Sequence, residues 1–281
     1  MNEKRREILN TAPSLLWLVG FVLVPVAIIF VIAFRPALPA GGIGAGWSLD
    51  AIRYLADYGY LSLLSNTVFV SAVTTMVCII IALPAAFCMA RLDAKWRSLV
   101  LLLVIVPFWT NFVIRVFAWQ QILHAQGWLA ETLRFLHLLG ENDRLLGNYF
   151  AVVIVSVYTY LPFAILPLFA AAEKFDFNLL DAARDLGARP LKAIFAVFIP
   201  GIRQGLVTAL LVVFIPMLGS YVVPDMVGGT STQMIGNKIA QRNFNDRNLP
   251  QAAALSAALT LLVLAPMFLR RKEPEPVESD F

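Results

Sequence analysis

The sequence has 281 residues, of which 59% are hydrophobic and 14% are charged. A soluble domain is typically about half apolar and a quarter charged, so this composition indicates a membrane protein and argues against a disordered, fibrous or nucleic-acid-binding chain. The two cysteines lie in one apolar run and the two histidines stand apart, so we expect no disulfide framework and no metal site. A GxxxxGK[ST] loop is absent, so the chain is expected to have no nucleotide-binding loop of its own.

Six windows with few or no charged residues predict an all-α protein with six membrane-spanning helices, since about 20 apolar residues cross a hydrocarbon core. The third window is the shortest, and Arg115 interrupts it, so this residue is expected near an interface. The first run is too long for a cleaved signal peptide and is interpreted as an uncleaved span. In chain order the predicted spans are 12–34, 65–90, 98–118, 147–172, 204–224 and 250–269.

Every predicted span contains or adjoins proline, which removes a backbone hydrogen-bond donor. The ordinary interpretation is a kinked membrane helix. Pro216, Gly219 and Pro224 are more closely spaced than the others, and a helix broken there could line a cavity.

Two outer connections, 127–140 and 233–244, are predicted to contain short amphipathic helices. In the first of them, the apolar residues that would face lipid or protein are Trp128, Leu129, Leu133, Leu136 and Leu139. Residues 1–272 are predicted to form one transmembrane domain, and the acidic tail 273–281 is expected to be disordered and cytoplasmic.

Lysine and arginine in the connections predict the orientation, because cytoplasmic loops are enriched in them. Fourteen lie on one side and seven on the other, which places both termini in the cytoplasm. The fourteen are Lys4, Arg5, Arg6, Arg91, Lys95, Arg97, Lys174, Arg184, Arg189, Lys192, Arg203, Arg270, Arg271 and Lys272. The seven are Arg35, Arg53, Arg134, Arg144, Lys238, Arg242 and Arg247.

The longest cytoplasmic connection, 173–203, contains a spaced motif. Adjacent alanines let a helix approach another protein closely, and a glycine supplies a sharp turn that most residues would strain to make. Nine residues separate this glycine from the apolar stretch that ends in the motif's proline. The motif residues are Asp181, Ala182, Ala183, Gly187 and Pro200.

An apolar ridge accompanies the motif. Leu179, Leu180 and Leu186 lie in a cytoplasmic loop, where no lipid is expected to cover them, so they need a partner groove. The competing interpretation is an ordinary amphipathic loop helix that rests on the membrane.

This segment resembles the EAA loop of ABC-importer permeases, EAA-x3-G-x9-I-x-LP. Asp181 stands in place of Glu, and Val197 and Ile199 replace Ile and Leu. The resemblance implies the fold of type I ABC importers in the bacterial inner membrane, with the loop docking on an ATPase subunit. It also implies a second homologous permease, two ATPase subunits that use ATP and Mg²⁺, and a periplasmic binding protein. On this resemblance the chain itself is expected to hold no cofactor and to carry no catalytic residue.

Further stretches resemble the spermidine/putrescine permeases within that superfamily. They are 107–119, 158–163, 166–168, 223–229, 234–237 and 245–250. The resemblance implies import of a polyamine. The sequence leaves open a permease for another small solute, such as an amino-acid derivative, a phosphonate or a metal chelate. A stand-alone channel or secondary transporter is disfavoured by the loop 173–203, which resembles the EAA loop, and by the scarcity of charges in the spans.

A polyamine would be recognised by carboxylates and by aromatic faces. Candidates in the outer half of the spans are Trp109, Tyr158, Tyr160, Tyr221 and Asp225. An equally weighted interpretation places Asp225 at the outer interface, and aromatic residues are common at both interfaces. Arg115 is expected to have a structural or gating role, because a cation pathway should not expose an unpaired positive charge.

The charge distribution makes a testable prediction about topology. Reporter fusions after Arg91, Arg203 and Lys272 should read cytoplasmic, whereas fusions near Gly44, Gly140 and Asp246 should read outside. An outside signal at Arg203 would overturn both the topology and the cytoplasmic placement of the motif.

Overall fold

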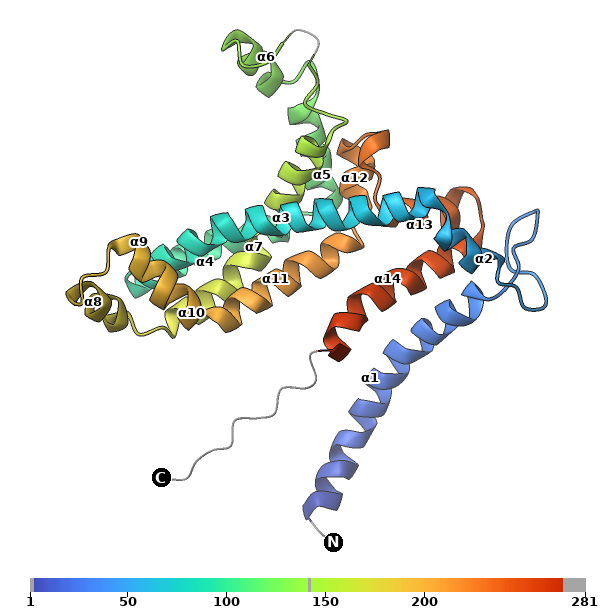
Figure 1. Ribbon diagram of the computed structural model, residues 1–281, viewed down its shortest axis with the longest axis horizontal. Coiled ribbons are helices and arrows are strands. Elements are labelled where there is room, and N and C mark those ends of the chain that lie inside the picture. Colours follow the sequence, from blue (N-terminus) through green and yellow to red (C-terminus); the bar gives the residue numbers. More distant parts are fainter. Residues whose placement is uncertain (1–2, 141–142, 270–281) are drawn as a thin grey trace. The chain divides into compact units, whose positions relative to one another are not determined.

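The computed structural model describes residues 3–140 and 143–269, and the regular secondary structure there is helical (Figure 1). The chain divides into two compact units, Met1–Ser62 with Lys238–Phe281, and Leu63–Asn237. The basic residues 270–272 and the predicted tail 273–281 lie outside the described residues.

In the first unit, helix α1 (Glu3–Ala33) packs against α14 (Leu249–Leu269). The contact uses small residues, Ala33 on α1 with Ala253 and Ala254 on α14. Between Leu15 and Ile28 α1 is apolar on all sides, and most of its large side chains are exposed. A helix of this composition is stable only when lipid or another protein surrounds it.

The predicted 233–244 helix is present in two parts. Helix α13 (Ile235–Ala240) continues into a π-helical turn, Gln241–Asn245. The Arg242 guanidinium donates to Asp246 at 2.8 Å and to the Tyr60 hydroxyl at 3.1 Å. Burial lowers the pKa of Arg242, but these two partners outweigh it and hold the pKa above its ordinary value, so the side chain stays charged.

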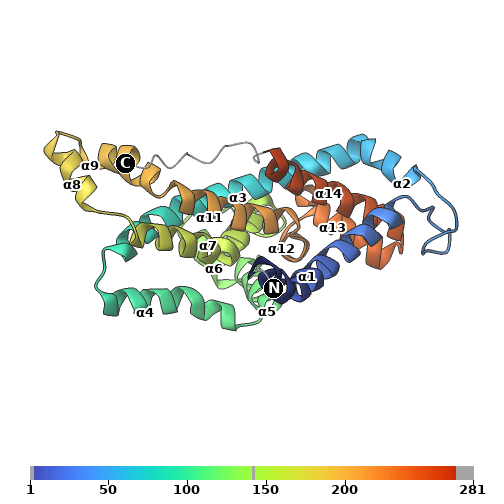
Figure 2. The same cartoon turned by 90° about the horizontal axis from the view of Figure 1, so that it is seen from below.

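The second unit is organised around α7 (Tyr149–Glu173) and α11 (Arg203–Leu218), which run side by side (Figures 1 and 2). Gly205 permits their close approach, because a Cβ there would collide with Ala171 and with the Pro167 carbonyl. The remaining longer helices are α3 (Tyr58–Ala90), which begins in the first unit, α4 (Ala94–Ile105) and α5 (Phe112–Leu123).

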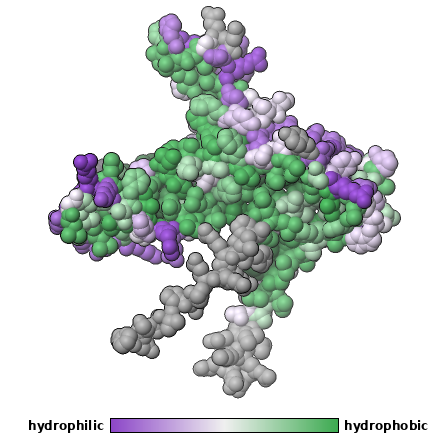
Figure 3. All heavy atoms as spheres, in the orientation of Figure 1, coloured by the Kyte–Doolittle hydropathy of each residue, from purple (hydrophilic) through white to green (hydrophobic). Residues whose placement is uncertain are grey.

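Within the described residues, three helices are long and apolar enough to cross a membrane: Thr11–Ala33, Gly59–Ala90 and Tyr149–Glu173. Two bent helix pairs raise this number to five if each counts as one span. Helix α14 occupies the sixth predicted window. In Figure 3, hydrophobic side chains cover the middle of the second unit, as a bilayer requires.

The third predicted span is sharply bent in the structure. Ala94–Trp109 and Phe112–Phe135 are bent by 91°. Pro107 lies in a 3-10 turn, Val106–Trp109, and Asn111 then starts a new helix by accepting the Val113 backbone N–H at 2.8 Å. Arg115 therefore lies in the first turn of α5.

The predicted outer helix at 127–140 is shorter than expected. Helix α6 (Trp128–Phe135) is present, and the chain turns after it at His137, whose φ is 57°. Leu129, Leu133 and Leu139 pack against the protein's own core, whereas Trp128 and Leu136 are exposed.

The α7–α11 contact generates a prediction about stability. Gly205→Ala should lower the free energy of unfolding of the purified protein in detergent by about 1–3 kcal/mol and so lower its melting temperature, because the new methyl group overpacks the contact. Gly20→Ala is the matched control, since nothing lies within 4 Å of a Cβ at Gly20 on α1. If both variants melt alike, the close approach of α7 and α11 is not under steric control.

Candidate functional site

The motif in 173–203 forms a short helix with a defined end. Helix α8 spans Asn178–Asp185, and Gly187 follows with φ of 86°. The Gly187 N–H donates to the Arg184 carbonyl at 2.8 Å, and the Ala188 N–H donates to the Ala183 carbonyl at 3.0 Å. This pair of bonds is the Schellman ending, which requires a left-handed residue. The predicted sharp turn at Gly187 is confirmed.

Helix α8 has an inner and an outer face. Leu180 is buried and Ala183 packs on the core, whereas Leu179, Ala182 and Leu186 face outward. The expected exposure of Leu180 was therefore wrong, whereas Ala183 is only partly buried and its contact with a partner stays a prediction. Positions 179, 182 and 186 are spaced by three and four residues and are neighbours on one helix face, whereas Leu180 points to another side, which adjacent residue numbers conceal.

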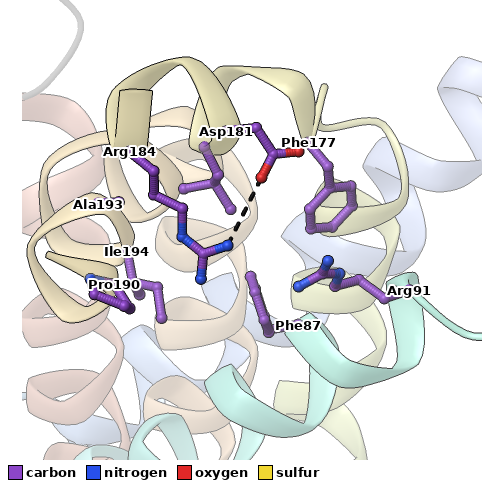
Figure 4. A pocket seen from close by; sticks show the side chains of 9 residues that line it. Phe87, Arg91, Phe177, Asp181, Arg184, Pro190, Ala193 and Ile194 are labelled. Atoms are coloured by element: carbon purple, nitrogen blue, oxygen red, sulfur yellow. Dashed lines mark ion pairs between the residues drawn. The ribbon is translucent and has the colours of Figure 1, made fainter. Parts of the chain in front are cut away.

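The acidic residue of the motif remains accessible. Asp181 is exposed, and its carboxylate lies 3.7 Å from the Arg184 guanidinium. An exposed pair at this distance stabilises the helix only slightly. Both residues line a cavity of about 90 Å³ beside α8 (Figure 4). Asp181 is thus free to contact another chain.

Pro200 lies in a second bent segment. The π-helical turn Ile194–Phe198 precedes α10 (Ile199–Gly201), and Pro190–Gly201 is bent by 75° from Arg203–Leu218. Proline lacks the N–H of a regular helix and its ring collides with the carbonyl four residues earlier, which the wider π-turn accommodates. The motif's proline therefore lies where the loop enters α11.

Four phenylalanines, which the sequence reasoning missed, form the seat of α8. Phe175 and Phe177 precede α8, Phe198 follows it, and Phe87 belongs to α3. Their ring centroids lie 4.9–6.3 Å apart in the contacting pairs. Gly201 lies against the Phe175 ring, where a Cβ would collide. We call Phe87, Phe175, Phe177 and Phe198 the aromatic seat.

The outer candidates are associated with a break in the fifth predicted span. Helix α11 ends at Leu218, and α12 (Val222–Val227) begins after a non-helical stretch. The break predicted from Pro216, Gly219 and Pro224 is thus confirmed. Tyr221 directly precedes α12, and its carbonyl accepts the Asp225 N–H at 3.0 Å. Both side chains are exposed.

The aromatic candidates do not converge on one surface. Tyr160 reaches Ser220 in the break, whereas Tyr158 packs edge-on against Trp119, with centroids 5.4 Å apart. Residues two apart on a helix point to different faces, which separates Tyr158 from Tyr160. Trp109, 78% exposed, ends the 3-10 turn before α5. Only Tyr160, Tyr221 and Asp225 are associated with the break, and their part in a substrate pathway stays a prediction.

Arg115 is held by an aromatic ring. Its guanidinium lies 5.2 Å from the centroid of Phe108, which in turn packs edge-on against Phe163. In the described part of the chain Arg115 forms no ion pair, and its buried Nε has no hydrogen-bond partner. Stacking on an aromatic ring is thus the interaction that holds this side chain.

Polar residues of α3 and α7 hold the segment after α12. Asn66 donates through Nδ2 to the Gln233 carbonyl at 2.9 Å and accepts from the Tyr149 hydroxyl at 2.7 Å. The Thr67 hydroxyl accepts the Ile235 N–H at 2.8 Å. An isolated asparagine in an apolar window was the available sequence signal, because a polar group in a membrane helix needs partners.

Comparison with known proteins gives consistent results. Residues 62–274 match the family described as binding-protein-dependent transport system inner membrane component. The spermidine/putrescine transport system permease protein PotB of Haemophilus influenzae is 34% identical over 253 residues, covering 90% of this chain and 88% of that protein. PotB of Escherichia coli is 36% identical over 247 residues, covering 88% and 90%.

The fold has solved counterparts. A chain in the crystal structure of a bacterial alginate ABC transporter, in complex with alginate pentasaccharide-bound periplasmic protein, aligns with a TM-score of 0.66. The alignment covers 95% of this chain and 93% of that chain at 16% identity.

Proposed function

This chain belongs to the family of inner-membrane components of binding-protein-dependent transport systems, and we propose that it is the permease subunit of an ATP-driven polyamine importer. The family and the apolar helices make it a multi-pass inner-membrane protein with the type I ABC importer permease fold. The observation that carries the substrate class is the 34% and 36% identity to two PotB proteins, whose names specify spermidine and putrescine.

The proposed assembly contains this chain, a second homologous permease, two ATPase subunits and a periplasmic substrate-binding protein. This chain binds no cofactor in the assembly, and the ATPase subunits use ATP and Mg²⁺. Both termini and the loop 173–203 face the cytoplasm, in keeping with the charge distribution.

The outer face of α8 is the proposed docking surface for an ATPase subunit. Leu179 is 51% and Leu186 90% exposed, with Ala182 between them on the same face. Beyond Gly187, Leu191 and Phe195 are also exposed. Large apolar side chains on a loop outside the bilayer favour burial in a partner groove.

Transport follows an alternating-access cycle in this proposal. ATP-driven closure of the ATPase pair displaces α8, and the displacement reaches the membrane through α7 and α11, to which the loop is joined. The break between α11 and α12 lies beside Tyr221 and close to Asp225, and broken helices commonly line transport cavities.

Uptake competition tests the substrate class. The complete transporter is reconstituted in proteoliposomes together with its binding protein. It should take up radiolabelled putrescine or spermidine when ATP is supplied. Excess unlabelled polyamine should abolish the signal, whereas amino-acid derivatives, phosphonates and metal chelates should not. Competition by one of these instead would assign the permease to that solute.

An ATPase-inactive partner separates this mechanism from a stand-alone channel or secondary transporter. Uptake should disappear when the partner can bind but not hydrolyse ATP. Continued uptake by that complex would refute ATP-driven import.

The Schellman ending generates a prediction about coupling. Gly187→Leu should abolish transport while membrane levels stay normal, because a leucine at φ of 86° costs about 1–2 kcal/mol and distorts the end of α8. Nothing lies within 4 Å of a Cβ there, so the strain is conformational. ATPase retention on purification and substrate-stimulated ATP hydrolysis report the loss.

Gly187→Asn is the matched control for this prediction. Asparagine tolerates the left-handed conformation better than leucine, so this variant should keep more activity. Normal transport by Gly187→Leu would remove the mechanical basis of the coupling role.

The broken fifth span generates a prediction about substrate charge. Asp225→Asn should reduce polyamine uptake at low concentration at least tenfold, since losing one partner of a desolvated charge pair costs about 2–5 kcal/mol. ATPase retention should not change. Asp225→Glu keeps the charge and should retain most uptake. If Asp225→Asn and Asp225→Glu both take up polyamine as the wild type does, Asp225 lies at the outer interface, outside the substrate pathway.

A further inference from the structure

Arg91 connects α3 with the segment that carries α8. It directly follows Ala90, the last residue of α3. Its guanidinium lies 5.6 Å from the ring centroid of Phe87 on α3 and 5.7 Å from that of Phe177, the residue before α8 (Figure 4). One cation thus contacts one ring from each element.

Phe87 is where α3 enters the aromatic seat. Its ring packs edge-on against Phe177 at 5.8 Å and against Phe198 at 4.9 Å. Phe175, Phe177 and Phe198 all belong to the loop 173–203. Within the aromatic seat, Phe87 is therefore the member supplied by a predicted membrane span.

Chain connectivity distinguishes α3 from the other helices around α8. The loop leaves α7 at Glu173 and enters α11 at Arg203, so both helices are joined to it covalently. Helix α3 ends more than eighty residues before α8 begins and meets this segment through side chains. Any displacement of α8 must reach α3 through contacts of this kind.

We propose that Arg91 and Phe87 are positioning residues that make α3 follow the movement of α8 during the transport cycle. The proposal rests on the proposed function, because it assigns the helix to which ATPase movement is transmitted. Arg91 suits the role because a planar guanidinium stacks on aromatic rings and remains charged. In the described part of the chain it forms no ion pair that would compete.

The test compares variants in the complete transporter and uses two measurements. The first is polyamine uptake per ATP hydrolysed in proteoliposomes. The second is the rate at which N-ethylmaleimide modifies Cys88, with and without vanadate trapping of the nucleotide. Cys88 is exposed on α3 one residue from Phe87, and Cys78 is buried, so Cys88 is a native reporter of α3.

In the wild type, trapping should change the rate of Cys88 modification. Arg91→Gln should lose most of this change and lower uptake per ATP roughly tenfold, equivalent to about 1.4 kcal/mol of lost coupling. The ATPase should remain bound and hydrolyse ATP. Phe87→Leu keeps an apolar side chain without the ring and should behave alike, whereas Arg91→Lys should be intermediate.

Arg203→Gln is the matched control, because Arg203 is exposed at the start of α11 and the change in charge is identical. It should match the wild type in both measurements.

Two outcomes overturn the proposal. One is a wild-type Cys88 response and wild-type uptake per ATP in both Arg91→Gln and Phe87→Leu. The other is dissociation of the ATPase from both variants, which would mean that these residues only hold α8 in place. A wild-type complex that hydrolyses ATP without polyamine uptake refutes the proposed substrate instead, and the Cys88 comparison still decides the role of Arg91.

Discussion

The close packing of α7 against α11 is the constraint on which the second unit depends. Gly205 brings the two backbones together beside Ala171 and Pro167. The loop 173–203 begins at the end of one helix and finishes at the start of the other, so their separation fixes the positions of both loop ends. Within that frame the aromatic seat holds α8, and the opposite end of α11 leads into the break before α12. One steric contact thereby positions both parts of the site.

Sequence reasoning was most successful where a local pattern has one physical solution. Charge-free windows of more than 20 residues predicted α1, α3, α7 and α14, and the spacing around Gly187 predicted a turn that the Schellman hydrogen bonds confirm. The third window is divided by a sharp bend, where Pro107 and Asn111 together end one helix and start another. Hydropathy averages over such a break, since the residues on both sides remain apolar.

Contacts between distant residues explain the remaining misses. Asn66 and Gln233 lie 167 positions apart, and Phe87 meets Phe177 and Phe198 only after folding. An apolar pattern indicates that a side chain is shielded from water, but it does not indicate which neighbouring residue shields it. For the same reason Leu180 was expected beside Leu179 and Leu186 on an exposed ridge, although it is buried in the hydrophobic cluster that contains the aromatic seat. The sequence placed Asp225 and Tyr221 near the break correctly, because the spacing of proline and glycine predicts the break itself.

The outer face of α8 also bears on how the transporter is made. Leu179, Leu186, Leu191 and Phe195 remain uncovered after this chain has folded around its own seat. On the proposed topology, a newly inserted permease presents these side chains to the cytoplasm until an ATPase arrives, and large exposed apolar groups favour non-specific association. Synthesis of the two subunits in balanced amounts would shorten that interval. Surplus permease would be a substrate for the proteases and chaperones that recognise uncovered apolar segments. The surface that binds the ATPase would therefore also lead to the removal of permease subunits that have no partner.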